Sequence, residues 1–374
     1  MATALTEGRE KPPVQRSELE SPRDPNEILI KLKGPKFARY RRDFSLAVSG
    51  QRPHFPLHLD VDITTVCQLA CPMCPAGQKD PQFPSLGLFL PESLYLAALR
   101  EGGKYGLPSL RLGMTGEPLL VPDIDNWVTA ARDFGVMDLS LITNGQYLTP
   151  YLSRKLILSG LTRLMISVDA ASSDTYQKIR PGGNFDLLLE NIKSFLAIRK
   201  NLGSVTPLLR LSFVDMSLNA SEKSQFRALF GPLADYLSIQ NYQNILGRDE
   251  TAWGLRPSEG GLCTEPRTRL ALLADGGLFP CCSDFGRLTP LGRFPDLSLY
   301  EAWNCPSAAD LAQGGQNHLS CRLCRQAANP ECSAWKKTGT SETDVSGCEP
   351  EGEINWPHLA GTAHPVNPQA TTWR

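Results

Sequence analysis

Residues 57–65, Leu-His-Leu-Asp-Val-Asp-Ile-Thr-Thr, read as a strand, and Cys67-Gln-Leu-Ala-Cys71-Pro-Met-Cys74 follows directly. Three thiolates cannot complete a tetrahedral zinc site, and they are one short of the four that usually hold an iron–sulfur cluster. A metal centre with three protein ligands keeps one coordination position open, as catalytic sites do and structural sites do not. The three cysteines therefore predict a metal at which chemistry takes place.

Composition and charge exclude several classes of protein. The chain has 374 residues, enough for one large domain and a smaller one. Its formal charge of −1 gives no electrostatic reason to expect a nucleic acid or an anionic membrane as partner. No apolar run is long enough to span a membrane, and the first residues lack a signal-peptide pattern. We therefore expect a cytoplasmic protein, in which eleven cysteines are metal ligands or catalytic groups rather than disulfides.

An alternation of strand-like and helix-like runs begins at residue 57. The strand-like runs are Leu57–Thr65, Leu110–Met114, Asp138–Thr143, Arg163–Asp169, Leu208–Val214 and Tyr236–Gln240. The helical patterns between and after them are Pro91–Glu101, Ile124–Phe134, Tyr151–Ser159, Phe185–Arg199 and Ser221–Phe230. Since parallel strands need helical crossovers, six such units predict an α/β fold, a partial (β/α)6 TIM-like barrel. Its site is expected at the C-terminal ends of the strands, where the first cysteines lie.

The chain divides into four predicted segments. Residues 1–54 are an N-terminal extension, polar and partly disordered up to about residue 26 and then helical and basic. Residues 55–253 form the barrel. Residues 254–335 form a small cysteine-rich domain that a metal supports, because their apolar content is thin for independent folding. Residues 336–374 are a loop-like tail.

The spacing CxxxCxxC after the first strand of a β/α domain resembles the radical S-adenosylmethionine (SAM) superfamily. The resemblance implies that Cys67, Cys71 and Cys74 bind three irons of a [4Fe–4S] cluster and that SAM occupies the fourth. The reduced cluster then cleaves SAM to methionine and a 5′-deoxyadenosyl radical, which abstracts a substrate hydrogen. An electron donor such as flavodoxin or ferredoxin is an implied partner. A chance match and a zinc site are the alternatives.

Further residues at the strand ends match the same family. Thr115-Gly116-Glu117-Pro118 resembles its Gly-Gly-Glu-Pro motif, which holds the methionyl ammonium, and Thr115 stands where the first glycine is usual. The resemblance implies that Thr115, Gly116, Glu117 and Asn144 bind the cofactor and that Ser167 and Asp169 lie near its ribose. It also places Arg180 at the cofactor carboxylate and Met73 against the adenine. Asn144-Gly145 is also an ordinary turn sequence, and Arg180 could equally be a solvated residue at a helix end.

A second group of cysteines follows the barrel. Cys263, Cys281 and the pair Cys321 and Cys324, together with the Leu297–Trp303 segment, resemble the auxiliary-cluster domain called SPASM or its shorter twitch form. Four thiolates complete one further [4Fe–4S] cluster, which suits electron transfer or structural support. A structural zinc with the same ligands is the alternative. Cys332 and Cys348 could join a second auxiliary cluster, and we favour the single-cluster form because Lys336 stands where a further cysteine is usual.

The expected activity is hydrogen abstraction from a small sugar- or cyclitol-like alcohol, leading to dehydrogenation, epimerisation or dehydration. Modification of a ribosomal peptide or a protein is the alternative, and a non-catalytic zinc protein is a more remote one. About 55 residues before the first strand are few for a precursor-binding winged helix, which favours a small molecule. Candidates to face the substrate are Asp215, Gln240 and Tyr242, and candidate thiol hydrogen donors are Cys282 and Cys305.

Overall fold

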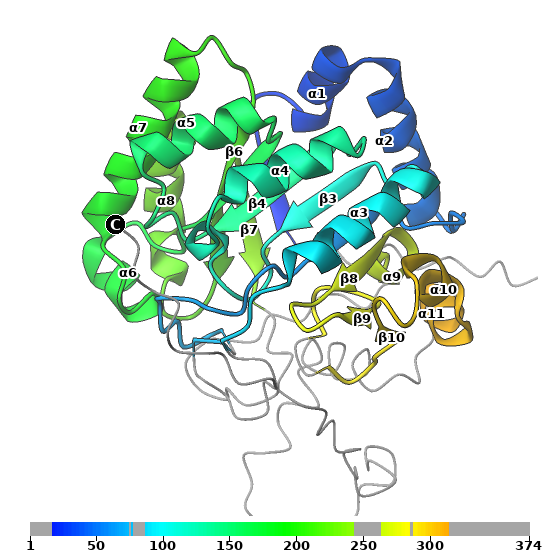
Figure 1. Ribbon diagram of the computed structural model, residues 1–374. Coiled ribbons are helices and arrows are strands. Elements are labelled where there is room, and N and C mark those ends of the chain that lie inside the picture. The colour runs from blue at the N-terminus through cyan, green and yellow to red at the C-terminus, as the bar shows by residue number, and fades with distance from the viewer. Residues whose placement is uncertain (1–16, 75, 78–86, 243–262, 285–286, 314–374) are drawn as a thin grey trace, which may run out of the picture. The chain divides into compact units, whose positions relative to one another are not determined.

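The computed structural model describes residues 17–74, 76–77, 87–242, 263–284 and 287–313. Within these residues the strands form one ten-stranded sheet in the order β1-β7-β6-β5-β4-β3-β2-β8-β9-β10. From β7 through β8 all neighbours pair in parallel, while β1 and the β9–β10 hairpin are antiparallel at the two edges (Figure 1). The strands are β1 Ser17–Glu20, β2 His58–Val61, β3 Ser109–Leu112, β4 Asp138–Thr143, β5 Arg163–Ser167, β6 Leu208–Asp215, β7 Tyr236–Asn241, β8 Arg269–Leu272, β9 Gly277–Phe279 and β10 Gly292–Arg293.

Helices connect successive parallel strands, and Figure 1 shows α3, α4, α5 and α7 lying over one face of the sheet. Ordinary capping residues set where they start, as when Thr149 and Asn184 accept hydrogen bonds from the first turns of α5 and α7. The helices are α1 Pro25–Lys33, α2 Pro35–Val48, α3 Glu92–Tyr105, α4 Ile124–Asp133, α5 Pro150–Ser159, α6 Ser173–Ile179, α7 Phe185–Asn201, α8 Lys223–Phe230, α9 Glu265–Thr268, α10 Leu299–Asn304 and α11 Pro306–Ala312, with short 3-10 turns η1 Pro118–Leu120, η2 Ala220–Glu222 and η3 Gly231–Leu233.

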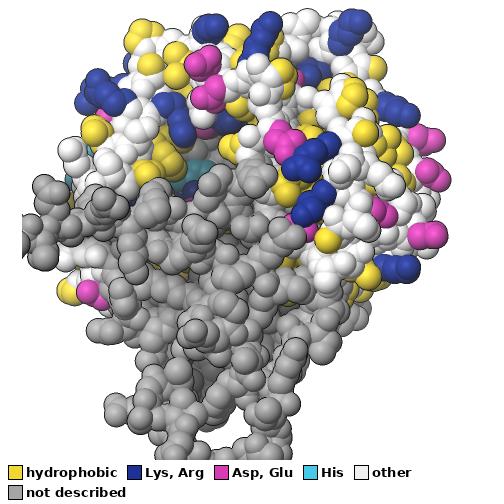
Figure 2. Space-filling view, turned by 180° about the vertical axis from the view of Figure 1, so that it is seen from behind, with side chains coloured by type: hydrophobic (Ala, Val, Ile, Leu, Met, Phe, Trp, Pro, Cys, Tyr) yellow, Lys and Arg dark blue, Asp and Glu magenta, His cyan; other side chains and the backbone are white. Residues whose placement is uncertain are grey.

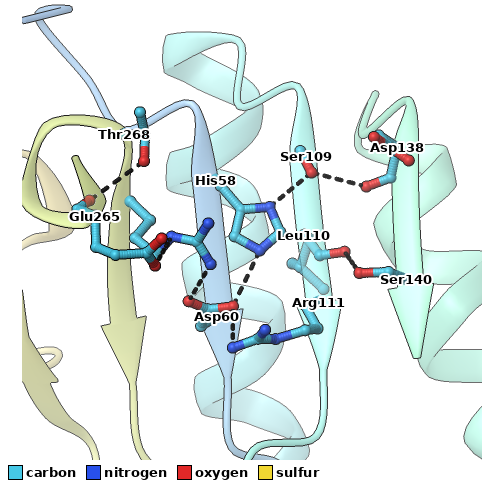
Figure 3. Close-up of polar contacts among 10 residues, drawn as sticks. His58, Asp60, Ser109, Leu110, Arg111, Asp138, Ser140, Glu265 and Thr268 are labelled. Atoms are coloured by element: carbon cyan, nitrogen blue, oxygen red, sulfur yellow. Dashed lines mark hydrogen bonds and ion pairs between the residues drawn. The ribbon is translucent and has the colours of Figure 1, made fainter. Parts of the chain in front are cut away.

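The two faces of the sheet differ in chemistry. Alternate apolar residues such as Leu59, Leu110 and Leu211 belong to the main hydrophobic core. The residues between them, which point to the opposite face, are largely polar or charged. Figure 3 shows this inner face at β2 and β3, where His58 and Arg111 converge on the Asp60 carboxylate. Although burial favours the neutral acid, the charges of Arg111, His58 and Arg269 hold the pKa of Asp60 well below its usual range.

Helices α1 and α2 pack against the beginning of β6 and β7. Leu29, Phe37 and Tyr40 form a cluster with Leu208 and Tyr236, which lie near the N-terminal ends of those strands. Strand β1 pairs with β7 through Ser17 to Glu20. The expectation of a loose arm up to about residue 26 is therefore wrong for residues 17–26, because the strand uses backbone hydrogen bonds offered by the edge of β7 and α1 begins at Pro25.

The predicted fold is confirmed, with a partial barrel built of parallel strands and crossover helices. The six predicted strands are β2 to β7, and the predicted helices agree with the observed ones to within a few residues at each end. One addition was not foreseen. Strand β8, which follows the predicted boundary at residue 253, pairs in parallel with β2 and extends the barrel sheet. Its run of four residues, Arg-Leu-Ala-Leu, is too short to give a periodic signal.

Charged side chains on the outside are mixed in sign. On the face shown in Figure 2, basic and acidic side chains of the described residues are interspersed rather than gathered by sign. This agrees with the formal charge of −1 for the whole chain. In the described residues no helix is long and apolar enough to cross a membrane.

Candidate functional site

Backbone hydrogen bonds join the loop after β3 to the residues just before Cys67. The Gly116 N–H donates to the Thr64 carbonyl at 3.1 Å, and the Glu117 N–H donates to the Val66 carbonyl at 2.8 Å. A β-carbon on Gly116 would lie 2.3 Å from the Thr64 oxygen, so only glycine allows this approach. The motif that sequence analysis assigned to cofactor binding therefore also fixes the start of the cysteine loop.

Cys67 lies beside the loop that follows β4. The side-chain N–H of Asn144 is 3.9 Å from the Cys67 sulfur, and the Gln68 amide donates to the Asn144 side-chain oxygen at 3.1 Å. N–H groups directed at thiolate sulfurs tune the potential of an iron–sulfur centre. Asn144 is therefore next to the predicted cluster ligand Cys67, while its predicted contact with SAM stays a prediction.

Cys71 and Cys74 lie on one tight turn, in which the Cys74 N–H donates to the Cys71 carbonyl at 3.0 Å. Gly77 packs against this turn so closely that a β-carbon on it would be 2.6 Å from the Cys71 nitrogen. Burial raises the pKa of the Cys71 thiol to about 11, against the opposing effect of the Arg180 charge. A bound metal, rather than solvent, would have to stabilise the thiolate here.

Arg180 and Asp169 form a buried ion pair next to Cys71. The Arg180 guanidinium is 2.5 Å from the Asp169 carboxylate and 4.0 Å from the Cys71 sulfur. The other Asp169 oxygen accepts from the Val214 N–H at 2.8 Å, and Asp169 itself adopts a φ of 64°. Both residues thus lie at the rim, as predicted, but in this structure their charges face each other, and their predicted cofactor contacts stay predictions. Ser167 ends β5 opposite Ser212.

Glu117 is buried and fully engaged with the protein. One carboxylate oxygen accepts from the Leu119 N–H at 3.0 Å and the Thr143 hydroxyl at 2.6 Å, and the other accepts from the Asn144 N–H at 2.7 Å. Burial raises its pKa, and these three donors oppose that shift. Glu117 therefore joins the loops after β3 and β4. Its predicted contact with the methionyl ammonium stays a prediction.

Thr115, the departure from the glycine that is usual here, has a partner of its own. Its hydroxyl donates to Asp62 at 2.6 Å, and its N–H donates to the same carboxylate at 3.1 Å. Asp62 is 1% exposed, and burial raises its pKa to about 6. Sequence analysis missed Asp62, although the alternation in Asp60-Val-Asp62 places both acids on the inner face of β2.

We expect the carboxyl of Asp62 to reduce stability as the pH rises. Between its unfolded pKa near 4 and its folded pKa of about 6, the folded protein binds more protons than the unfolded chain. The free energy of unfolding of the wild type, relative to Asp62→Asn, should therefore fall between pH 4 and pH 7, by up to roughly 3 kcal/mol. Denaturant unfolding of both proteins across this range measures the difference, and parallel curves would contradict the assignment.

Met73 packs at the ends of β6 and β7. Together with Ile179, Met216, Val214 and Tyr242 it forms a small apolar cluster. This brings Met73, predicted to contact the adenine, next to Tyr242, predicted to face the substrate. Both roles stay predictions.

The other predicted catalytic residues are spread over the fold. Asp215 at the end of β6 pairs with the Lys223 ammonium at 2.8 Å, and the Gln240 amide donates to the Ser238 hydroxyl at 3.3 Å. Cys305 lies at the junction of α10 and α11, near Arg52. Cys282 lies near the guanidinium of Arg111 on the inner face.

One pocket joins the barrel rim to the cysteine-rich segment. Its lining residues are Asp62, Met114, Thr115, Leu273, Phe279, Cys281, Cys282, Asp284 and Arg287. The predicted auxiliary-cluster ligand Cys281 and the carboxyl of Asp62 therefore share one cavity. Cys263 lies just before α9, and Cys321, Cys324, Cys332 and Cys348 lie outside the described residues.

The residues around Cys67, Cys71 and Cys74 suit a cluster. In the described parts of the chain, no three His, Cys, Asp or Glu side chains converge as ligands of a single ion would. A cubane cluster sets a different requirement, because each thiolate binds a different iron. Three soft donors on one loop, with Asn144 and Arg180 directed at two of the sulfurs, meet that requirement.

Comparison with known proteins identifies two domains in the chain. The model of the radical SAM superfamily matches residues 61–211, and that of the SPASM iron–sulfur cluster-binding domain matches residues 263–326. A probable GTP 3′,8-cyclase of Saccharolobus solfataricus is 32% identical over 169 residues, which are 45% of this chain and 51% of that protein. The chain thus spans about half the length of this curated relative.

Two solved structures show the same fold at low identity. Streptococcus suis SuiB bound to precursor peptide SuiA is 16% identical with a TM-score of 0.58, over 78% of this chain and 75% of SuiB. Native anSMEcpe, with bound AdoMet and the Cp18Cys peptide, is 15% identical with a TM-score of 0.55, over 72% of this chain and 88% of that one. The chain therefore belongs to the radical SAM superfamily through residues 61–211, and carries a SPASM domain at residues 263–326.

Proposed function

We propose that this radical SAM enzyme is an oxidoreductase that removes hydrogen from the carbinol carbon of a small sugar- or cyclitol-like alcohol. The observation that carries the proposal is the pocket in which Asp62 and Cys281 both take part. It places a carboxyl with a pKa of about 6 in the same cavity as a predicted ligand of the auxiliary centre. Oxidation of an alcohol needs both a proton acceptor and an electron acceptor near the substrate.

The two domains imply a [4Fe–4S] cluster with SAM and at least one auxiliary [4Fe–4S] cluster. We assign Cys67, Cys71 and Cys74 to the first, and Cys263, Cys281, Cys321 and Cys324 to the auxiliary one. When bound, these groups supply hydrogen-atom abstraction from carbon and an acceptor for one electron. An electron donor such as flavodoxin or ferredoxin would reduce the first cluster.

The chain's own residues have three tasks in this reaction. Glu117 and Gly116 hold the loops that carry the cysteines at a fixed distance from the ends of β3 and β4. Asp62, held by two hydrogen bonds from Thr115, accepts the hydroxyl proton at its carboxylate. The alcohol thus loses one hydrogen atom from carbon, one proton from oxygen and one electron, and becomes a ketone.

Two observations favour a small molecule over a peptide. Residues 17–48 are occupied by β1, α1 and α2, which pack on the barrel. The related GTP 3′,8-cyclases are named for a small molecule, GTP, and the similarity covers 45% of this chain. The likeness to the peptide-bound enzymes concerns the fold alone.

Replacing Cys281 by alanine should distinguish the role of the auxiliary cluster from that of the SAM-cleaving cluster. SAM cleavage by the strongly reduced protein should persist, since the first cluster keeps its three ligands, while oxidation of substrate should fall by at least about a hundredfold, because the electron acceptor is lost. The measurement is 5′-deoxyadenosine and ketone formed in the same anaerobic assay. Equal loss of both products would assign Cys281 to the SAM-cleaving site instead.

A labelling experiment tests the substrate class. Cyclitols and hexoses deuterated at their carbinol carbons, with and without a phosphate ester, are incubated with the reduced enzyme and SAM. Deuterium in the 5′-deoxyadenosine together with a ketone product supports the proposal. Deuterium transfer from a labelled peptide, with none from any alcohol, would overturn it in favour of peptide modification.

A further inference from the structure

We propose that the inner face of the barrel sheet binds an oxyanion of the substrate, a phosphate or carboxylate group, through Arg210 and Ser212. This inference rests on the proposed function in that the anion belongs to the molecule oxidised at the rim. The binding site itself is argued from the described side chains of the inner face alone.

Strand β6 places these two residues on the inner face. Leu209, Leu211 and Phe213 belong to the hydrophobic core on the helix side. Because side chains alternate along a strand, Arg210 and Ser212 point to the opposite face, toward the interior of the barrel. The cluster of α1 and α2 against Leu208 covers the N-terminal end of this face. A ligand of Arg210 would therefore approach from the rim.

Several hydrogen-bonding groups on this face have no partner among the described residues. The Ser212 hydroxyl is buried, in a residue only 4% exposed, and makes no hydrogen bond to them. The Nε–H groups of Arg111 and Arg210 are likewise buried without such a partner. Buried donors are satisfied in the great majority of native proteins, so three unsatisfied donors on one face indicate a missing acceptor. Since all three can donate, the acceptor should be rich in oxygen lone pairs.

The charges on the inner face leave Arg210 without a carboxylate partner among the described residues. Arg163 pairs with Asp138 at 2.8 Å, and Arg111 pairs with Asp60 at 2.7 Å. Arg269 pairs with Glu265 at 2.7 Å and with Asp60 at 3.4 Å. Figure 3 shows the pairs around Asp60.

Burial lowers the pKa of Arg210, Tyr236 opposes this shift, and the nearby charges of Arg111 and Arg163 add to it. A half-buried cation beside other cations is unfavourable until an anion neutralises it. Guanidinium groups match the oxygens of carboxylate and phosphate, which makes these the fitting ligands.

The position of Arg210 also limits the size of the ligand. Val214, on the same face of β6, packs in the cluster with Met73 beside the cysteine loop. Four residues of a strand span about 13 Å, so one small molecule can reach from Arg210 to the rim. An anionic sugar derivative held by Arg210 would present its hydroxyl groups to the pocket of Asp62 and the loop of Cys67.

The test measures binding of inorganic phosphate and of acetate to the full-length reconstituted protein, by calorimetry and by thermal unfolding at fixed ionic strength. Wild type should bind at least one of the two anions and gain thermal stability from it. Arg210→Gln should weaken that binding by roughly tenfold to a hundredfold. Arg210→Lys should keep part of the affinity, and Ser212→Ala should lose less than Arg210→Gln. The anion that binds more tightly indicates whether the anionic group of the substrate is a phosphate ester or a carboxylate.

Arg154→Gln is the matched control, because Arg154 is an exposed residue of α5. Without anion, Arg210→Gln should be at least as stable as the wild type, since it removes an uncompensated charge, whereas a structural arginine would lower the Tm when replaced. Equal binding to wild type and Arg210→Gln, or no binding of either anion to the wild type, overturns the site. A protein that binds the anion but forms no 5′-deoxyadenosine contradicts the proposed function alone.

Discussion

Replacing Cys71 by alanine is expected to abolish 5′-deoxyadenosine formation and to remove the iron bound at the rim. Cys71 is the most buried of the three thiols, at 6% exposure, and the Arg180 guanidinium lies 4.0 Å from its sulfur. Two remaining thiolates cannot hold a cluster that needs at least three protein ligands and keeps one position open for SAM. The measurements are iron content after anaerobic reconstitution and 5′-deoxyadenosine after addition of a strong reductant.

Cys305→Ala is the matched control for that experiment. Cys305 lies at the junction of α10 and α11 and is not part of the loop of Cys67, Cys71 and Cys74. Its replacement should leave SAM cleavage unchanged, even if the thiol serves as a hydrogen donor to substrate. If Cys71→Ala retains both iron and cleavage, Cys71 is not a ligand and the assignment of the first cluster is wrong.

Replacing Gly116 by alanine is expected to disrupt the rim without changing any ligand. The new β-carbon would lie 2.3 Å from the Thr64 oxygen and 2.7 Å from the Val66 oxygen, both of them backbone atoms that side-chain movement cannot relieve. The hydrogen bonds of residues 116 and 117 to these carbonyls would have to break. We expect a loss of about 2–4 kcal/mol of stability. Cluster content and SAM affinity should fall with it.

Gly231→Ala is the control, because no atom outside its chain neighbours lies within 4 Å of a β-carbon at that position. It should cost much less stability than Gly116→Ala, since the crowding at residue 231 comes from the ring of Pro232, which follows it in a helical backbone. Thermal unfolding and iron content compare the two variants. A Gly116→Ala protein with wild-type Tm and full iron content would show that the loop after β3 does not position the cysteine loop.

The parts of the fold that the sequence predicts are those with a local signal. The six parallel strands and their crossover helices follow from periodicity, and the site follows from three cysteines placed after the first strand. Strand β8 gives no such signal, because four residues become a strand only when β2 supplies hydrogen bonds. Strand β1 depends in the same way on the edge of β7.

The contacts within the site depend on tertiary structure. In the sequence, Thr115 is only a departure from the usual motif. The structure shows that its N–H and its hydroxyl both donate hydrogen bonds to Asp62. Arg180 and Asp169 look like two separate cofactor contacts until they are seen to pair. Among the described residues, the lack of a carboxylate beside Arg210 depends on which arginines pair with carboxylates across neighbouring strands, and that requires the register of the sheet.

The central claim is that Cys67, Cys71 and Cys74 hold a cluster at which SAM is cleaved. The most direct measurement is the amount of 5′-deoxyadenosine that the anaerobically reconstituted, full-length protein forms from SAM with a strong reductant. We predict that 5′-deoxyadenosine and methionine appear in equal amounts and only in the presence of reductant. A colourless protein that binds zinc and forms neither product would contradict the claim.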